Sequence, residues 1–201
     1  MKIQLTLKAL LVMLMSFCSQ SVWGQGCDDF SKLSSNSSYT DFKTEAGWTV
    51  TNSSRLSSFH EYIDEGYIAV CINGKTTDVG TITSPLLSGG CGTLRLKYAC
   101  PYAETKGVSF NVAILKNGSI AKEYDVVNTS VAQKTAYEWE QEINVSGEFA
   151  IYIINNSPSK NSKSNADRYA IWNINWSAYG ESLKSDQTLI FSSSSCTADL
   201  S

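Results

Sequence analysis

The stretch "VSFNVAILKNGSIAKEYDVV", Val108 to Val127, decides the fold class. Apolar residues occupy alternate positions of its first half, which is the period of a β-strand with one buried face. Asn117-Gly118 follows, a pair that tolerates the positive φ values of a tight hairpin turn. The segment therefore predicts a β-hairpin whose first strand has four inward residues, Val108, Phe110, Val112 and Ile114.

The same alternation recurs along the rest of the chain. In "TLRLKYAC" it places Leu94, Leu96, Tyr98 and Cys100 on one face. Further strands are expected at Trp48 to Asn52, Tyr67 to Ile72, Thr81 to Ser84, Tyr137 to Ile143, Phe149 to Ile154, Ala170 to Tyr179 and Thr188 to Ser192. Two polar stretches, Ser31 to Thr40 and Asn155 to Asp167, are expected to be irregular. About ten short strands without a convincing helix predict an all-β protein, a two-sheet antiparallel β-sandwich of the jelly-roll, galactose-binding-like class.

The first 24 residues have the layout of an export signal: Lys2 and Lys8, an apolar run from Ala9 to Phe17, and an end at Gly24. The apolar run is too short for a membrane span. We therefore expect a signal peptide at 1-24, a sandwich domain at 25-179, and a C-terminal edge strand with a Ser-rich tail at 180-201. The exported protein would work in the periplasm, at the cell surface or outside the cell. Lipidation at Cys18 or Cys27 stays open as an alternative.

The charge balance argues against nucleic acid as a partner. The formal net charge is -3, and loss of Lys2 and Lys8 with the signal makes it more negative. Nucleic-acid binding depends mainly on clustered Lys and Arg, and the sequence has no such cluster.

Five cysteines remain after signal cleavage, and an exported protein can oxidise them. One strand would hold Cys91 and Cys100 at opposite ends, too far apart for a bond between them. Cys71 is then the expected partner of one of these two, and Cys27 with Cys196 could join the termini. A zinc site is the weaker interpretation, because the chain has no CxxC motif and one histidine, His60.

The strongest catalytic candidates lie in "YEWEQE", where Glu138, Glu140 and Glu142 project from one face of a strand roughly 7 Å apart. Glycoside hydrolysis uses paired carboxylates at about such separations. The pattern resembles the ExDxE strand of the laminarinase-like jelly-roll glycosidases, with Glu140 in place of the central Asp. A solvated acidic strand face is the preferred interpretation. His60 with Ser57 or Ser58 offers no triad motif, and we expect it to be a loop or surface residue.

Three aromatic rings crowd "YAIWNINW", Tyr169 to Trp176. Uninterrupted alternation assigns Ala170, Trp172, Ile174 and Trp176 to one face, which we expect to be core. The opposite face then carries Tyr169, Ile171, Asn173 and Asn175. Tyr169 with Asn173 and Asn175 is accordingly the candidate ligand-binding set, one ring beside two amides.

Calcium is a possible structural cofactor, since secreted sandwich modules often use an oxygen-ligand site near the termini. Asp28 and Asp29 precede the first expected strand and are the candidate ligands. No DxDxDG loop supports them, so the indication is compositional. No other cofactor is expected.

Four motifs in order, "VGTITSPLLSGGCGTLRLKYA", "GVSFNVAILKNGSIAKEYDV", "INVSGEFAIYIINNSPS" and "DRYAIWNINW", resemble a β-sandwich module of secreted proteins from anaerobic Gram-negative bacteria. Such modules also occur appended to extracellular nucleases, and members are treated as carbohydrate-binding-like or adhesive jelly rolls. The resemblance runs from about Asp28 to Trp176. It implies a non-catalytic module and supplies no ligand residues.

Three functions are therefore weighed. The first is an exported, non-catalytic module that binds a glycan or a surface glycoprotein, supported by 5 Trp, 10 Tyr and 7 Phe in the chain. The second is a small jelly-roll glycoside hydrolase that uses Glu138 and Glu142. The third is a structural or adhesive surface protein with a protein partner.

Overall fold

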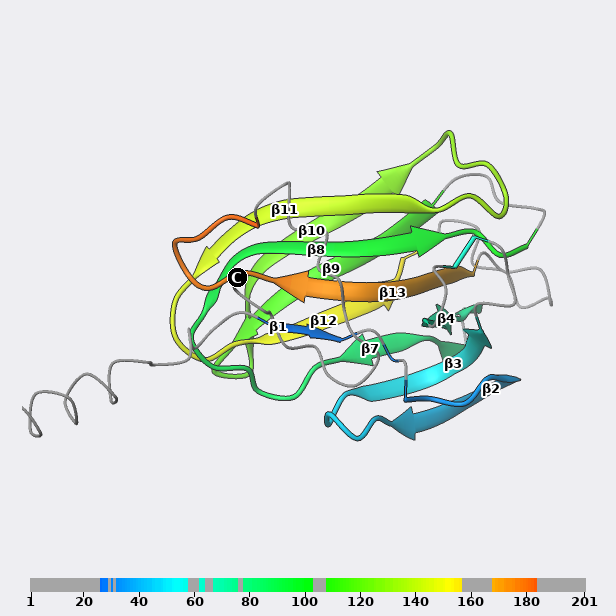
Figure 1. Cartoon of the computed structure of the whole chain (residues 1–201), viewed down its shortest axis with the longest axis horizontal. Helices are drawn as coiled ribbons and strands as arrows, with labels where there is room; N and C mark the ends of the chain where they lie inside the picture. Colours follow the sequence, from blue (N-terminus) through cyan, green and yellow to red (C-terminus); the bar gives the residue numbers. More distant parts are fainter. Residues whose placement is uncertain are drawn as a thin grey trace, which may run out of the picture.

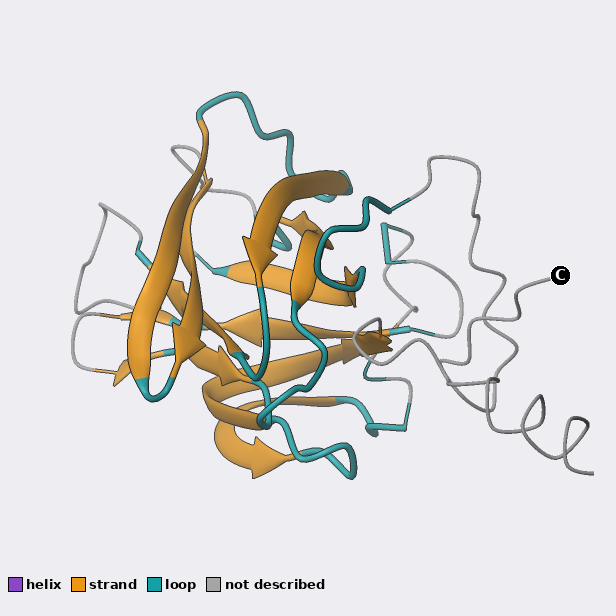
Figure 2. Cartoon of the chain, turned by 90° about the vertical axis from the view of Figure 1, so that its left-hand side faces the viewer, coloured by secondary structure: helices purple, strands orange, loops and turns teal. Residues whose placement is uncertain are grey.

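A computed structural model describes residues 26–28, 30, 32–57, 62–63, 67–75, 78–102, 108–156 and 168–183. These residues contain strands and loops but no helix (Figure 2). None of them forms a helix long and apolar enough to cross a membrane. The strands are β1 (Gly26–Asp28), β2 (Asn36–Lys43), β3 (Thr49–Ser57), β4 (Ile68–Ile72), β5 (Gly74–Lys75), β6 (Asp78–Val79), β7 (Thr81–Thr83), β8 (Cys91–Ala99), β9 (Val108–Lys116), β10 (Ser119–Asn128), β11 (Tyr137–Val145), β12 (Ala150–Asn155) and β13 (Tyr169–Trp176).

The strands form a two-layer sandwich. Hydrogen bonding follows one antiparallel path, β10-β9-β12-β7-β3-β4-β13-β8-β11, with β1 beside β13 and β2 beside β3. The path curls over, so that β11, β8 and β13 pass in front of β10, β9 and β12 (Figure 1). Side chains from the two layers meet between them: the Phe110 ring of β9 lies 5.4 Å from the Tyr98 ring of β8 and 6.0 Å from the Tyr169 ring of β13, measured between centroids.

One strand turns the corner between the layers. β3 pairs with β7 through Thr49–Thr51 and with β4 through Ser53–Ser57, and Asn52 between these segments has φ 46°. From β8 onward the chain crosses repeatedly between layers: β9, β10 and β12 lie in one, and β8, β11 and β13 in the other. This is jelly-roll connectivity, and the predicted all-β sandwich is confirmed.

The main core lies between the layers, and alternating residues fill it. Leu94, Leu96, Tyr98 and Cys100 of the β8 region belong to it, as do Val108, Phe110, Val112 and Ile114 of β9. The hairpin is confirmed as well: β9 and β10 pair from Lys116 with Ser119 onward, and Asn117 and Gly118 have φ 53° and 74°.

A second, smaller core covers the opposite side of the β3-β4-β13-β8 region. Its buried members are Leu56, Tyr62, Ile63, Ala69, Cys71, Ala99, Ala170 and Trp172. This part of the sheet is therefore buried on both faces, which explains why β4 is buried at all five positions.

The strand predictions differ from the structure in several places. β3 continues to Ser57, five residues beyond the predicted end at Asn52. Residues Asn36–Lys43, five of which fall in the stretch expected to be irregular, form edge strand β2. Its polar side chains are largely exposed, so it has little hydrophobic periodicity, and its pairing with β3 holds it in place. β13 ends at Trp176, three residues before the predicted end. The predicted signal peptide and the strand at Thr188 to Ser192 lie outside the described residues, as do Asp29 and His60.

The predicted disulfide between Cys71 and Cys91 or Cys100 is wrong, because none of these three cysteines is disulfide-bonded. Cys71 belongs to the second core, whereas Cys91 and Cys100 belong to the main core on the other side of the sheet. Cys27 is disulfide-bonded. Its predicted partner, Cys196, lies outside the described residues.

The protein is expected to lose stability at alkaline pH. Burial raises the pKa of Cys71 from 9.0 to about 11 and that of Cys91 from 9.0 to about 12. Burial also raises the pKa of Tyr39, Tyr62 and Tyr98 above 10.0. These groups ionise earlier in the unfolded chain, so their contribution is complete below about pH 9 and is lost as the pH rises toward 12.

Urea unfolding at pH 7.5, 9.5 and 11 measures this effect. The midpoint concentration is expected to fall at each step. An unchanged midpoint at pH 11 would contradict the assignment of these groups to the interior.

Candidate functional site

Five strands present a continuous outward face on the layer that contains β9. The row Val50, Ile82, Ile153, Val112 and Tyr124 runs across β3, β7, β12, β9 and β10 in register and points into the main core. Because side chains alternate, the rows on either side of it point outward. One, the asparagine row, consists of Thr51, Thr81, Ile154, Asn111 and Asp125. The other, the tyrosine row, consists of Thr49, Thr83, Tyr152, Ala113 and Glu123.

These ten residues are called the outer face, which extends on the order of 19 Å across five strands. The two β9 residues in the middle of the outer face are buried: Ala113 is 1% exposed and Asn111 is 6% exposed. Tyr152 flanks Ala113 on β12, and Glu123 flanks it on β10. The outer face therefore places a phenol ring and a carboxylate on either side of a small residue.

The polar groups of the outer face are positioned by one another. The Asn111 amide Nδ2 donates to Asp125 Oδ1 at 3.1 Å. The hydroxyls of Thr51 and Thr81 lie 2.7 Å apart. Burial raises the pKa of Tyr152, in keeping with a ring partly covered by its neighbours. The ten residues supply hydroxyls, an amide, carboxylates and one ring, and they include no Lys or Arg.

A second polar and aromatic group lies where β13 begins. The Arg168 guanidinium carbon is 5.2 Å from the centroid of the Tyr39 ring and 4.9 Å from that of the Tyr102 ring. Tyr39 is partly buried, and its hydroxyl is 3.6 Å from the Cys71 sulfur. Tyr102 is 44% exposed. Tyr39, Arg168 and Tyr102 are called the tyrosine–arginine stack.

The candidate ligand residue Tyr169 is fully buried, at 0% exposure, and its expected place on a surface face is wrong. A β-bulge breaks the alternation of β13: three steps from Trp172 to Asn175 match two steps of β8, and Asn173 has φ 53°. Tyr169 and Ile171 consequently face the main core together with Ile174 and Trp176. Trp172 faces the second core. Both tryptophans are buried, as predicted, but in different cores.

The two candidate asparagines bond to each other. Asn175 is 5% exposed, and its Nδ2 donates to the backbone oxygen of Asn173 at 2.8 Å and to its Oδ1 at 2.7 Å. This pair stabilises the bulge. It does not stand beside an exposed Tyr169 ring, and its role in ligand binding stays a prediction.

Glu138, Glu140 and Glu142 lie on the exposed face of edge strand β11. Arg95 of the neighbouring strand β8 forms ion pairs with Glu138, at 3.4 Å, and with Glu140. Asn144 donates to Glu142. Cross-strand pairs of opposite charge are a usual stabilising feature of sheets. The glycosidase set stays a prediction that these contacts do not favour.

Asp28, the first calcium candidate, is 8% exposed, and its Oδ1 accepts a hydrogen bond from the backbone N–H of Phe30 at 2.8 Å. It therefore shapes the turn after β1. Among the described residues, no group of three or more His, Cys, Asp or Glu side chains is placed to hold a metal ion. Calcium at Asp28 and Asp29 stays a prediction.

Sequence reasoning missed the outer face and the tyrosine–arginine stack. Alternation alone assigns Asn111 and Tyr152 outward, since Val112 and Ile153 point inward. The pairing of β12 with β9 and β7, which brings these residues together, has no local signal in the sequence.

No family model matches the chain, and no curated protein matches it. Solved structures with some similarity include the carbohydrate-binding module TmCBM61 in complex with β-1,4-galactotriose, at 13% identity and TM-score 0.44, over 65% of this chain and 88% of that one. The K2 cleaved adhesin domain of Lys-gingipain matches at 12% identity and TM-score 0.48, over 76% and 97%. A family 35 carbohydrate-binding module from Clostridium thermocellum matches at 16% identity and TM-score 0.44, over 69% and 97%. At this level of similarity, their ligands say nothing about the ligand of this chain.

Proposed function

We propose that the protein is an exported, non-catalytic binding module for a glycan or the glycan of a glycoprotein, and that the outer face is its contact surface. The observation that carries the proposal is the register of the two outward rows. It places the Tyr152 ring next to Ala113, one row from the Asn111–Asp125 hydrogen bond.

The chemistry of the outer face suits a sugar. Sugars bind through C–H contact with an aromatic face and through a few directed hydrogen bonds. Tyr152 offers the ring, while Asp125 and Glu123 are exposed carboxylates that accept hydrogen bonds from hydroxyls. Lys43 of β2 pairs with Thr49 and adds a cation at one edge of the tyrosine row. A glycan with free hydroxyls is therefore the ligand class that the outer face fits.

Binding to plant, host and microbial glycans on an array tests the proposal, followed by calorimetric titration of the strongest ligand. Tyr152→Ala is expected to weaken binding at the outer face at least tenfold, about 1.4 kcal/mol, because it removes the stacking surface. Tyr152→Phe keeps the ring and is expected to bind within a few-fold of the natural protein.

The matched control is Tyr179→Ala, which removes a tyrosine that is 53% exposed and lies outside both rows. It should bind as the natural protein does. If the natural protein binds no glycan on the array, the proposal is overturned, and a protein partner becomes the next hypothesis.

A further inference from the structure

We propose that the chain carries a second glycan-binding site, centred on the exposed ring of Tyr102, which makes the protein bivalent. This inference rests on the proposed function, because it assigns the same class of ligand to a different surface. It is carried by the tyrosine–arginine stack, which lies outside the outer face.

The stack holds the Tyr102 ring in place. Arg168 lies against both rings, with its guanidinium carbon 4.9 Å from the Tyr102 centroid and 5.2 Å from the Tyr39 centroid. Tyr39 is itself fixed by its contact with the buried Cys71 sulfur at 3.6 Å. A ring oriented before binding loses less conformational entropy when a ligand stacks on it.

Hydrogen-bonding groups lie on the loop beside the strand end that leads to this ring. The loop between β10 and β11 runs beside the end of β8, because Cys100 forms a β-bridge with Gln133 and the Lys134 N–H donates to the Cys100 oxygen at 2.9 Å. Gln133 and Lys134 are exposed, and Tyr102 follows Cys100 by two residues. An exposed ring and an amide on the adjoining loop are groups through which a sugar can bind.

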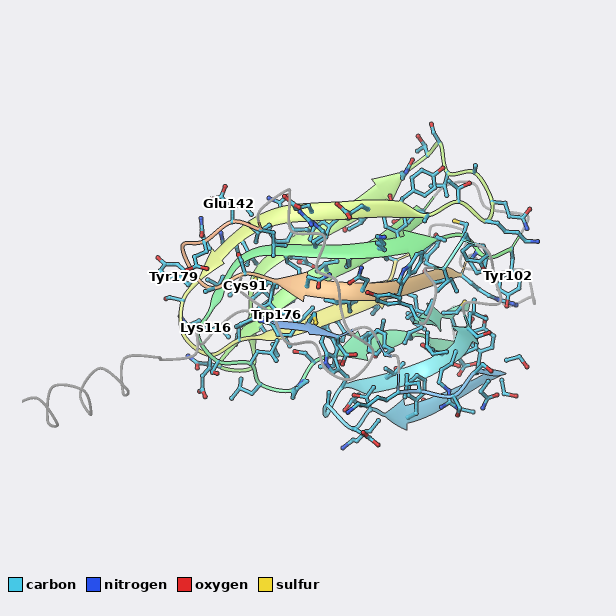
Figure 3. The ribbon with its side chains drawn as sticks, in the orientation of Figure 1. Cys91, Tyr102, Lys116, Glu142, Trp176 and Tyr179 are labelled. Carbon is cyan, nitrogen blue, oxygen red and sulfur yellow. The ribbon has the colours of Figure 1, made fainter. Side chains whose placement is uncertain are left out.

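A single exposed ring favours a small ligand over a protein surface. The other large exposed apolar side chains in the described residues are Leu86, Ile120, Val127 and Tyr179. Tyr179 lies at the opposite end of the molecule from Tyr102 (Figure 3). A stable protein interface needs roughly 800 Å² on each partner, with aromatic residues gathered in its centre. A single ring matches one face of one sugar residue instead.

The two sites cannot be filled by one sugar residue. The outer face belongs to β3, β7, β12, β9 and β10 and points away from the other layer. Tyr102 follows β8, and Arg168 precedes β13, both strands of that other layer. A chain with both sites occupied would link two glycan chains, or two positions on one long chain, and would gain avidity on a dense surface.

Calorimetric titration with the strongest oligosaccharide from the array counts the sites. The natural protein is expected to bind two per chain. Tyr102→Ala is expected to bind one, with the affinity of the remaining site unchanged, and Tyr152→Ala is expected to leave only the Tyr102 site. Tyr102→Phe and Tyr179→Ala are the matched controls and should retain two sites.

Agglutination of glycan-coated beads by protein shown to be monomeric is the second measurement. The natural protein should crosslink the beads, whereas Tyr102→Ala and Tyr152→Ala should each coat them without crosslinking. One site per chain that Tyr102→Ala leaves intact would overturn this inference and preserve the proposed function. An absence of binding to any glycan would overturn both.

Discussion

Replacing Tyr169 with alanine is expected to lower the free energy of unfolding by about 3–5 kcal/mol, the range for removal of a large buried aromatic side chain. The Tyr169 ring is 0% exposed and lies 6.0 Å from the Phe110 ring of the facing layer. Alanine there leaves a cavity between the layers that rigid strands on both sides cannot close. Urea unfolding of Tyr169→Ala beside the natural protein measures the loss.

The same substitution at an exposed tyrosine shows how much of the stability loss comes from burial of the side chain. Tyr179→Ala makes the same chemical change at a side chain that is 53% exposed, and it should alter stability by no more than about 0.5 kcal/mol. Native stability in Tyr169→Ala, combined with a specific loss of glycan binding, would return Tyr169 to the list of ligand residues and would contradict its place in the core.

The predicted surface position of Tyr169 was wrong because β13 contains a bulge. Strand periodicity identifies β13 and the burial of its two tryptophans, but it assumes that alternation is unbroken. The bulge at Asn173, which has a positive φ, adds one residue to β13. Every side chain after the bulge therefore lies on the opposite face from the one that unbroken alternation predicts. Asparagine tolerates this conformation better than most residues, yet asparagine also occurs in regular strands. The bulge therefore could not be inferred from the presence of asparagine at position 173 alone.

Local and non-local features differ in the same way elsewhere. The hairpin at Asn117-Gly118 was predictable because its strands, turn and register are encoded within twenty neighbouring residues. The outer face depends instead on β12 lying between β9 and β7, which are far apart in the chain. Tyr102 and Arg168 are likewise distant in sequence and meet only because β8 and β13 are neighbours. The candidate sites could thus not be predicted from the sequence, because the strand order that assembles them has no local signal.

Replacing Cys27 with serine is expected to cost about 2–4 kcal/mol of stability, the usual contribution of a native disulfide. Cys27 is disulfide-bonded in β1, a strand of three residues that pairs with Ile174, Asn175 and Trp176 of β13. So short a strand has few hydrogen bonds of its own. Gly26 beside it lies against the Trp176 ring, where a Cβ would overlap the indole. Without the covalent link, β1 should separate from β13 and uncover Trp176. The loss is measured by urea unfolding of Cys27→Ser.

The partner of Cys27 can be identified by comparing the stability losses of the single and double cysteine-to-serine variants. The other described cysteines, Cys71, Cys91 and Cys100, are not disulfide-bonded. Cys18 belongs to the predicted signal peptide, so Cys196 is the predicted partner. If the two are bonded, Cys196→Ser should destabilise by the same amount as Cys27→Ser, and the double variant should be no less stable than either single variant, since only one bond is lost. A reducing agent should destabilise the natural protein but not the Cys27→Ser variant. Additive losses in the double variant would contradict the pairing, because they would require two independent interactions rather than one covalent bond.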